Sequence, residues 1–174
     1  EALKHKILLY GANGYTGELI LKELLKETDL TVIIAGRNPQ KIETLAKTYH
    51  VESDVFSVDD AELALQKHIG CVLVINAAGP FTKTANLLAK ACIKNRMHYV
   101  DITGEIAVFQ ELQKLNQLAV NVGTMLLPGA GFDVVPTDCL ANKLKSELPS
   151  ATHLEMAFAS KGGGLSRGTA KTSV

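Results

Sequence analysis

The sequence predicts an α/β fold: a Rossmann-like, doubly wound parallel sheet with helices on both faces, followed by the start of a second α+β domain. Short apolar segments alternate with amphipathic segments along most of the chain, as in sheets built from β-α-β units. The first apolar segment ends in three glycines, Gly11, Gly14 and Gly17, spaced G-x-x-G-x-x-G. A strand that passes through such a turn into a helix is typical of dinucleotide-binding domains.

The composition excludes several classes of function. At 174 residues the chain is long enough for one domain with a substantial core. The 18 Lys and Arg residues balance the 18 Asp and Glu residues, so charge gives no basis for binding nucleic acid or an anionic membrane surface. The longest apolar stretches, such as residues 69–75, are far too short to form a transmembrane segment. No signal peptide is visible in a chain that begins at Glu1, and we expect a cytoplasmic protein.

The cysteines and histidines do not form a metal-binding pattern. Cys71, Cys92 and Cys139 stand far apart within apolar segments, which predicts buried, reduced thiols. The histidines are scattered, and neither a C-x-x-C nor an H-x-x-x-H pair occurs. The sequence therefore predicts no metal site.

The glycine-rich segment is the first candidate binding site. The apolar run Ile7–Leu9 predicts a buried strand, and Gly11 is expected to take the positive φ of the turn that follows. Gly14 would let the backbone approach a phosphate, and Gly17 would let the next helix pack closely on the strand. Free N–H groups and the positive dipole of a helix N-terminus suit a dinucleotide pyrophosphate. An ordinary strand-turn-helix unit without a ligand is the alternative.

The end of the second strand distinguishes NAD from NADP. Residues 30–35 form an apolar, β-branched run, expected for a strand buried on both faces. In dinucleotide-binding units a carboxylate near this point binds the ribose of NAD, whereas an Arg accommodates the 2′-phosphate of NADP. No carboxylate is present here, and Arg37 follows the glycine turn at the expected separation of about 20 residues. We therefore expect NADP(H), with an exposed loop Arg as the alternative. Asn38 fits the N-cap of the next helix.

A third segment reaches the same end of the predicted sheet. Residues 53–58 are expected to form a short strand, which places Val58 and Asp59 beside the adenine pocket. Asp59 is a candidate acceptor for the adenine amino group. Capping of the following helix by Asp59 and Asp60 is an equal alternative.

The fourth predicted strand is central. Residues 71–75 are the most apolar run of the chain, and the small residues after them leave room for a ligand where the strand order reverses. We expect Phe81 near the nicotinamide. A Gly-Pro turn that only starts a helix is the alternative. The residues expected against the cofactor ribose and phosphates are Ala77, Ala78, Gly79 and Pro80.

The remaining periodicities predict elements whose buried faces can be tested. Strands are expected at 98–102 and 124–127. Residues 152–159 alternate polar and apolar residues, which indicates a half-solvated strand of a different sheet. We therefore place a cofactor-binding domain at 1–149 and the beginning of a second domain at 150–174. The expected buried stripes are Leu19, Ile20, Leu24 and Leu25 in the first helix; Leu87, Leu88, Ala91 and Cys92 in a helix at 84–95; Ile106, Phe109, Leu112, Gln113, Asn116 and Ala119 in one helix that ends near Val122; and Leu140, Ala141 and Leu144 in a last helix closed by Pro149.

Together these segments resemble the saccharopine dehydrogenase/reductase-like family, in particular its branch of saccharopine dehydrogenase-like oxidoreductases and trans-acting enoyl reductases. No single segment is specific, whereas the joint match in the family's order is. The matching segments are GANGYTG (11–17), AGRN (35–38), NAAGPF (76–81), YVDITGE (99–105), PGAGFDVVPTD (128–138) and GGGLSRGTA (162–170).

The resemblance implies an NADP(H)-binding Rossmann domain at the N-terminal end of a longer protein. Residues 150–174 would begin its substrate and dimerisation domain, so the resemblance implies a homodimer formed through the missing part and a small-molecule or lipid-like substrate. Arg37 and Asn38 match the family's 2′-phosphate end, and residues 77–80 match its ribose and nicotinamide side. The residues that match its pyrophosphate pattern are Gly11, Asn13, Gly14, Tyr15, Thr16 and Gly17.

The sequence names no catalytic residue, because the cofactor itself carries the chemistry of hydride transfer. Four candidates follow predicted strands: Asp101, Thr103, Glu105 and Asp133. Stabilisation by a helix dipole is an alternative role for Glu105, and helix capping is one for Asp133. No Tyr is followed by Lys four residues later, so the Tyr-x-x-x-Lys acid of short-chain dehydrogenases is absent.

The leading hypothesis is an NADPH-dependent oxidoreductase of the saccharopine dehydrogenase-like type, with hydride transfer to an enoyl or imine acceptor. This chain would supply the cofactor-binding domain and be inactive alone. The alternatives are a non-catalytic NADP(H) sensor or scaffold module and a domain that binds no dinucleotide.

Overall fold

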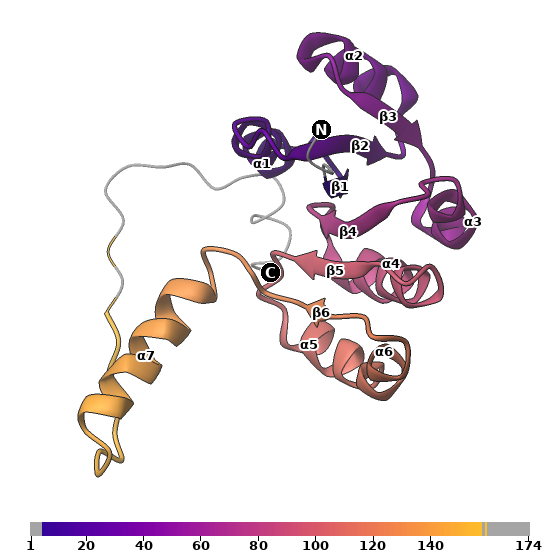
Figure 1. Ribbon diagram of the computed structural model, residues 1–174. Coiled ribbons are helices and arrows are strands. Elements are labelled where there is room, and N and C mark those ends of the chain that lie inside the picture. The colour runs from indigo at the N-terminus through magenta and orange to yellow at the C-terminus, as the bar shows by residue number, and fades with distance from the viewer. Residues whose placement is uncertain (1–4, 158, 160–174) are drawn as a thin grey trace.

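The computed structural model describes residues 5–157 and 159, and these residues form a parallel sheet with helices on both faces (Figure 1). The strand order is β3-β2-β1-β4-β5-β6, and each adjacent pair is parallel. This order is that of the Rossmann fold, so the predicted fold class is confirmed. The strands are β1 (His5–Tyr10), β2 (Leu30–Gly36), β3 (Glu52–Val55), β4 (Cys71–Asn76), β5 (His98–Asp101) and β6 (Leu126–Leu127).

One hydrophobic cluster lies on each face of the sheet. In register, Leu8 of β1 pairs with Ile33 of β2, and Leu9 pairs with Ile34. Leu8 and Ile33 belong to the first cluster, whereas Leu9 and Ile34 belong to the second. The two pairs separate in this way because successive side chains of a strand point to opposite faces. The strands are thus buried on both faces, as their continuous apolar runs predict.

The helices divide between these clusters according to their order in the chain. The second cluster receives helices α1 (Tyr15–Leu24) and α2 (Pro39–Tyr49). The first cluster receives the following helices: α3 (Ala61–Gln66), α4 (Phe81–Lys94), α5 (Ile106–Gln113) and α6 (Asn116–Val122). A short 3₁₀ turn at Val58–Asp60 precedes α3. The chain therefore winds in both directions from β1, which lies between β2 and β4. Such a reversal leaves a crevice at the carboxyl ends of the central strands.

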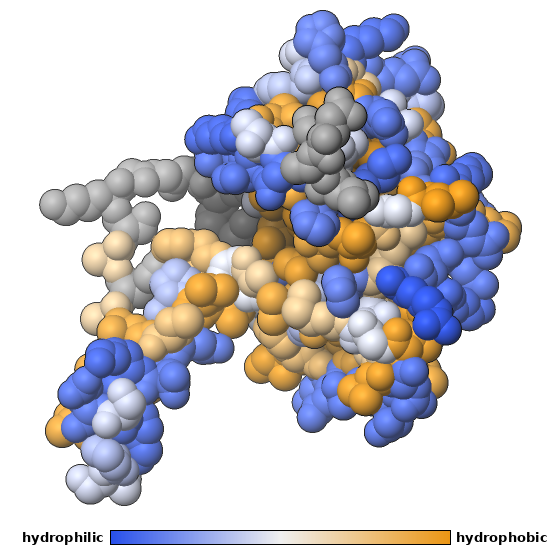
Figure 2. All heavy atoms as spheres, in the orientation of Figure 1, coloured by the Kyte–Doolittle hydropathy of each residue, from blue (hydrophilic) through white to orange (hydrophobic). Residues whose placement is uncertain are grey.

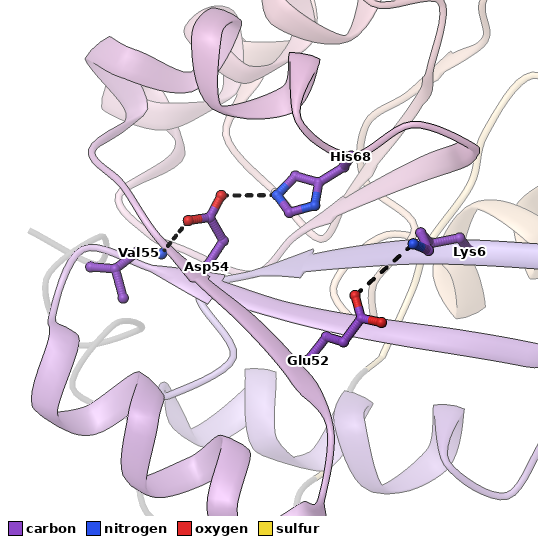
Figure 3. A network of polar contacts seen from close by, with 5 residues as sticks. All are labelled: Lys6, Glu52, Asp54, Val55 and His68. Carbon is purple, nitrogen blue, oxygen red and sulfur yellow. Dashed lines mark hydrogen bonds and ion pairs between the residues drawn. The ribbon is translucent and has the colours of Figure 1, made fainter.

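The edge strand β3 is held by polar side chains (Figure 3). Asp54 accepts a hydrogen bond from the Val55 N–H at 2.8 Å, and its other carboxylate oxygen lies 2.9 Å from His68 Nε2. Lys6 of β1 and Glu52 approach to 4.0 Å. Asp54 thereby joins β3 to the segment after α3, at a strand with little apolar surface of its own.

Several expected buried positions prove to be wrong. In α1 the buried side chain is Leu21, whereas Leu19 is 45% exposed and Leu25 is 40% exposed. In α4 Leu88 is fully buried, but Leu87 is 39% exposed. The rest of both expected stripes faces the core: Ile20 and Leu24 pack against one hydrophobic cluster, and Ala91 and Cys92 are buried in the other. The expected stripes are therefore wrong only at their flanking leucines, because Leu is common on both sides of these helices.

The single helix expected from Ile106 to Val122 is two helices. α5 ends at Gln113 and α6 begins at Asn116. Leu112 and Ala119 of the expected stripe are buried, whereas Ile106 is 74% exposed and Gln113 and Asn116 are also exposed. Val108, Leu112, Leu115 and Ala119 form a buried stripe at helical spacing that continues across the break. The sixth strand is also shorter than expected, since β6 comprises only Leu126–Leu127.

The last described helix, α7 (Val135–Glu147), projects away from the sheet (Figure 1). It has no buried residue, so the expected buried side formed by Leu140, Ala141 and Leu144 is wrong within the described structure. Hydrophobic and hydrophilic atoms are both exposed on this projecting arm (Figure 2). Residues 151–157 and 159 form no strand, and Phe158 lies outside the described residues. The domain boundary at 149/150 stays a prediction.

The three cysteines differ in environment. Cys71 and Cys92 are buried, as expected, whereas Cys139 on α7 is exposed. Burial raises the pKa of the Cys71 and Cys92 thiols, which keeps them protonated and unreactive. The prediction of a buried Cys139 fails for the same reason as the predicted face of α7.

Leu88→Ala and Leu87→Ala make a matched test of the inner face of α4. Leu88→Ala should lower the free energy of unfolding by about 2–5 kcal/mol, because the lost side chain leaves a cavity in the core. Leu87→Ala should lower it by less than about 1 kcal/mol, as expected for a partly solvated position. Urea unfolding followed by circular dichroism measures both losses. Equal losses would contradict the orientation of α4.

Candidate cofactor-binding site

The turn between β1 and α1 is built around backbone contacts that exclude side chains. Gly11 has φ of +82°, and a Cβ added there would lie 2.7 Å from the backbone nitrogen of Ala78. A Cβ added to Gly17 would overlap the carbonyl oxygen of Gly11 and lie 2.9 Å from Ala12 Cα. Gly11 thus provides the left-handed turn, and Gly17 lets α1 pack onto it. Both expectations for these glycines are confirmed.

The N-terminus of α1 lies after the carboxyl end of β1, where this strand order predicts a crevice. Its N-cap residue is Gly14, and no side chain caps the helix. Apart from its two chain neighbours and the backbone of α1, the described atom near a Cβ added to Gly14 is the Gly11 carbonyl oxygen, at 3.4 Å. The first N–H groups of any α-helix have no partner within the helix, so this end presents free donors beside open space. Tyr15 and Thr16 of the first turn are exposed. This geometry fits a pyrophosphate.

Asn13 connects the glycine turn to the end of β2. Its Oδ1 lies 2.9 Å from the position of a Cβ on Gly36, and Ile42 of α2 lies 3.0 Å from the same point. Any side chain at residue 36 would therefore displace Asn13 or Ile42. Asn13 is exposed, so it remains accessible from the crevice. Gly36 is a site residue that the glycine spacing of the first turn does not reveal.

The segments that carry Arg37 and Asp59 are joined by hydrogen bonds: the Phe56 N–H donates to the Gly36 carbonyl at 3.1 Å. The Tyr10 hydroxyl donates to the Phe56 carbonyl at 3.0 Å. Burial raises the pKa of Tyr10, while the charge of Arg37 lowers it and that of Asp59 raises it. Both charges act at this hydroxyl, so the structure brings together the two residues expected at the adenosine end. Arg37 is exposed and forms no hydrogen bond or ion pair with another described residue.

The neighbouring residues at this end have local structural roles. Asn38 caps α2, because its Oδ1 accepts a hydrogen bond from the Lys41 N–H at 3.0 Å. Ser57, rather than Asp59, caps the 3₁₀ turn that contains Val58, and the Ser57 hydroxyl donates to the Asp59 carboxylate at 3.1 Å. Asp60 stands at the N-cap of α3 without a side-chain hydrogen bond. The capping alternative is therefore right for the position of Asp60, although its side chain makes no cap, and wrong for Asp59. Contact of Asp59 with adenine stays a prediction.

The segment after β4 lies against the glycine turn. The Ala77 N–H donates to the Tyr10 carbonyl at 2.8 Å. Ala77 and Ala78 are partly buried, Gly79 is exposed, and Pro80 is the N-cap residue of α4. The Gly79–Pro80 peptide bond is cis. The structure thus brings residues 77–80 to the crevice beside the glycine turn, as the strand order predicts.

A buried polar cluster supports this segment from behind. Asn76 Nδ2 donates to the Tyr99 hydroxyl at 3.1 Å, and that hydroxyl donates to Asp101 Oδ2 at 2.7 Å. Asp101 Oδ1 accepts from the N–H groups of Thr103 and Gly129, at 3.0 and 2.9 Å. Burial and the Asp101 charge raise the pKa of Tyr99, so its hydroxyl keeps the proton that it donates. The cluster joins the carboxyl ends of β4 and β5 to the loop after β6.

Asn76 and Glu105 connect this cluster to the segment after β4. Asn76 Oδ1 accepts from the Ala78 N–H at 3.0 Å, and the Thr84 hydroxyl donates to the Ala78 carbonyl at 2.7 Å. Glu105 Oε1 accepts from the Phe81 N–H at 3.1 Å, across 24 residues of sequence. Both ends of the segment 78–81 are therefore held by side chains from neighbouring elements.

The four catalytic candidates occupy different environments. Asp101 and Thr103 are fully buried. Asp101 accepts a hydrogen bond from the Thr103 N–H, and the Thr103 hydroxyl accepts one from the Glu105 N–H. Glu105 is partly exposed. Asp133 is exposed, and its Oδ2 lies 4.0 Å from the position of a Cβ on Gly104. Val134, not Asp133, is the N-cap residue of α7. Of these four, only Glu105 and Asp133 have exposed surface that a ligand could contact. The catalytic residue stays unknown.

Sequence reasoning missed the residues that hold the site in place. The motifs give no role to Asn76, although its amide contacts three partners, or to the Tyr99 hydroxyl, which donates to Asp101. A signal was nevertheless present, because Asn76 and Asp101 are polar residues directly after apolar strands. Buried polar groups require hydrogen-bond partners, and partners at the same sheet edge could have been sought.

Comparison with known families identifies this architecture. Residues 7–127 match the family described as the saccharopine dehydrogenase NADP binding domain. The chain belongs to this family. The resemblance seen in the sequence is thereby confirmed, and NADP(H) is the cofactor of the domain. The matched region includes the glycine turn, Arg37 and the segment after β4.

Individual proteins show the same relationship. The chain is 28% identical over 159 residues to a protein called "Lipid droplet localized protein" from Caenorhabditis elegans, covering 82% of this chain and 36% of that protein. It is 28% identical over 140 residues to a "Trans-acting enoyl reductase" from Mycobacterium ulcerans, covering 76% of this chain and 34% of that protein. The chain therefore spans about a third of the length of these relatives.

A solved structure supports the fold. Saccharopine dehydrogenase (L-Glu forming) from Saccharomyces cerevisiae superposes with a TM-score of 0.72 at 23% identity, covering 83% of this chain and 31% of that chain.

None of the helices in the described part of the chain is long and apolar enough to cross a membrane. Within residues 5–157 and 159, no three His, Cys, Asp or Glu side chains are grouped so as to hold a metal ion.

Tyr99→Phe tests the buried polar cluster. The variant removes the hydroxyl that donates to the buried Asp101, and hydrogen bonds to charged groups contribute about 1.5–3 kcal/mol. We expect a loss of unfolding free energy in that range. Tyr10→Phe is the matched control, since it removes one hydrogen bond to a neutral carbonyl and should cost about 1 kcal/mol. Urea denaturation measures both, and a smaller loss for Tyr99→Phe than for Tyr10→Phe would contradict this account of the cluster.

Proposed function

We propose that this chain is the cofactor-binding domain of an NADPH-dependent oxidoreductase that transfers a hydride to an enoyl or imine acceptor. The observation that carries the proposal is the N-terminus of α1, which has no side-chain cap, together with Arg37 at the end of β2, which pairs with no other described residue. Free N–H donors after β1 and a guanidinium after the neighbouring strand β2 lie at the same edge of the sheet, and they suit the pyrophosphate and the 2′-phosphate of a single dinucleotide.

Each part of the proposed site has residues of suitable chemistry. The glycine turn and first turn of α1, including Asn13, Tyr15 and Thr16, would hold the pyrophosphate. Arg37 would pair with the 2′-phosphate, and Asn38 would assist through its amide nitrogen, since its oxygen caps α2. Val58 and Asp59 would border the adenine. Residues 77–80 would border the second ribose and the nicotinamide, which supplies the hydride when the cofactor is bound.

Two observations bear on the acceptor. A relative is called a trans-acting enoyl reductase, and the family takes its name from saccharopine dehydrogenase, whose chemistry involves an imine. Either acceptor needs only to be held against the nicotinamide face, because the cofactor carries the reducing electrons. The exposed carboxylates of Glu105 and Asp133 are the described acidic groups at that end of the crevice.

The broader setting of the domain is part of the proposal. We place residues 1–149 in the cofactor domain and 150–174 at the start of a substrate and dimerisation domain, in a cytoplasmic protein. A relative is named for lipid droplets, so imaging of the tagged protein is the direct test of compartment.

The complete burial of Asp101 and Thr103 favours, as a second candidate function, a domain that senses NADP(H) without turnover.

Arg37→Ala tests the assignment of the 2′-phosphate. The variant should weaken NADPH binding about 10- to 100-fold, because a charge-assisted pair of about 1.5–3 kcal/mol is lost. Affinity for NADH, which has no 2′-phosphate, should change less than about twofold. Titrations monitored by nicotinamide fluorescence measure both affinities.

Arg96→Ala is the control for this experiment. Arg96 is exposed and precedes β5 at the amino end of the sheet, so the same chemical change should leave both affinities unaltered. If the parent protein binds NADH as tightly as NADPH, the role given to Arg37 is wrong.

Turnover tests the proposed reaction. The chain of 174 residues should bind NADPH without oxidising it, because the acceptor site is expected in the following domain. A protein extended to the length of its relatives should oxidise NADPH when an enoyl or imine substrate is supplied. Absorbance at the reduced nicotinamide band follows both reactions. Binding without turnover in the extended protein, across both acceptor classes, would instead support the sensor.

A further inference from the structure

The N-terminus of α4 is capped by a side chain from a different β-α unit. Pro80 at its N-cap provides no side-chain acceptor, and the Phe81 N–H donates instead to Glu105 Oε1 at 3.1 Å. Glu105 itself occupies the N-cap position of α5 but makes no side-chain cap there. Its carboxylate therefore satisfies α4 rather than the helix that it begins.

Glu105 is also held from the side of the buried polar cluster. The Glu105 N–H donates to the Thr103 hydroxyl at 3.1 Å, and the Thr103 N–H donates to Asp101 at 3.0 Å. Asp101 connects through Tyr99 to Asn76, which accepts from the Ala78 N–H. The hydrogen bonds thus run from Ala78 through the cluster to Glu105 and return to the same loop at Phe81.

This arrangement has two consequences for the segment 78–81. First, Asn76 fixes its beginning and Glu105 fixes its end, while Phe81 packs against the hydrophobic cluster and lies 3.9 Å from the position of a Cβ on Gly79. Second, the carboxylate of Glu105 occupies the positive end of α4, which makes this end unfavourable for a phosphate, whereas the N-terminus of α1 has no side-chain cap. Glu105 is the member of this hydrogen-bonded circuit that stands partly exposed at the crevice.

We infer that Glu105 is a positioning residue for the nicotinamide half of the cofactor: by capping α4 it sets the segment 78–81 against which that half binds. The inference rests on the proposed function, because residues 77–80 are assigned to the cofactor there. It removes Glu105 from the set of candidate proton donors. It also predicts that Glu105 acts on one half of the dinucleotide and not on the other.

Two ligands and two variants test this role. NADPH contacts the whole site, whereas adenosine 2′,5′-bisphosphate reaches only the adenosine end near Arg37 and the glycine turn. Glu105→Ala should weaken NADPH binding about 10-fold and leave adenosine 2′,5′-bisphosphate binding within about twofold of the parent. Glu105→Gln keeps a side-chain acceptor of similar reach, and it should recover most of the NADPH affinity. Isothermal titration calorimetry on the chain measures all affinities.

Glu111→Ala is the control, because Glu111 is an exposed carboxylate on α5 that pairs with Lys114. It should bind both ligands like the parent. Unchanged NADPH affinity in Glu105→Ala would overturn the inference, as would equal loss of both ligands, which would indicate a general effect on the fold. A Glu105→Gln variant as weak as Glu105→Ala would overturn the hydrogen-bond mechanism. A parent that binds neither ligand would overturn the proposed function itself.

Discussion

The backbone contact between the glycine turn and the segment after β4 is the constraint on which the site depends. The Ala77 N–H donates to the Tyr10 carbonyl at 2.8 Å, and a Cβ on Gly11 would lie 2.7 Å from Ala78 N. On the other side, the Gly11 N–H donates to the Ala35 carbonyl at 2.8 Å. The end of β1 is thus held between β2 and β4 at the point where the strand order reverses. The close contact leaves no room for a side chain on Gly11 and directs the first turn of α1 into the crevice.

Burial of polar groups behind this contact is tolerated because each has a partner. Asp101 is fully buried, and both of its oxygens have partners: one accepts from Tyr99 and the other from two backbone N–H groups. Unpaired, such a buried carboxylate would be strongly destabilising. Paired, it fixes the ends of β4, β5 and the loop after β6 relative to one another. The segment 78–81 therefore rests on a rigid base, even though it has no regular structure until α4 begins.

The sequence predicted those features whose causes are local. Gly11 takes a positive φ, Asn38 caps α2 and the β-branched run at 30–35 is buried on both faces, because each outcome depends on a few neighbouring residues. Features that depend on distant residues were not predictable in this way. Glu105 looks like the first residue of its own helix, and only the fold brings it to Phe81. The predictions that Leu87 and one face of α7 are buried fail for the same reason. A periodic stripe of apolar residues does not specify which element will pack against it.

The same distinction separates the two halves of the site. At the proposed adenosine end, Arg37 and Asn38 follow β2 directly and need only the glycine turn nearby, so the expected contacts with the 2′-phosphate depend on short sequence motifs. At the nicotinamide end, the geometry of residues 78–81 depends on Asn76, Tyr99 and Glu105, which come from different β-α units. Changes in any of these units can alter how an acceptor meets the cofactor without touching the phosphate sites. A fold arranged in this way can keep its cofactor while its acceptor changes, which accords with a family whose relatives share this domain but carry different names.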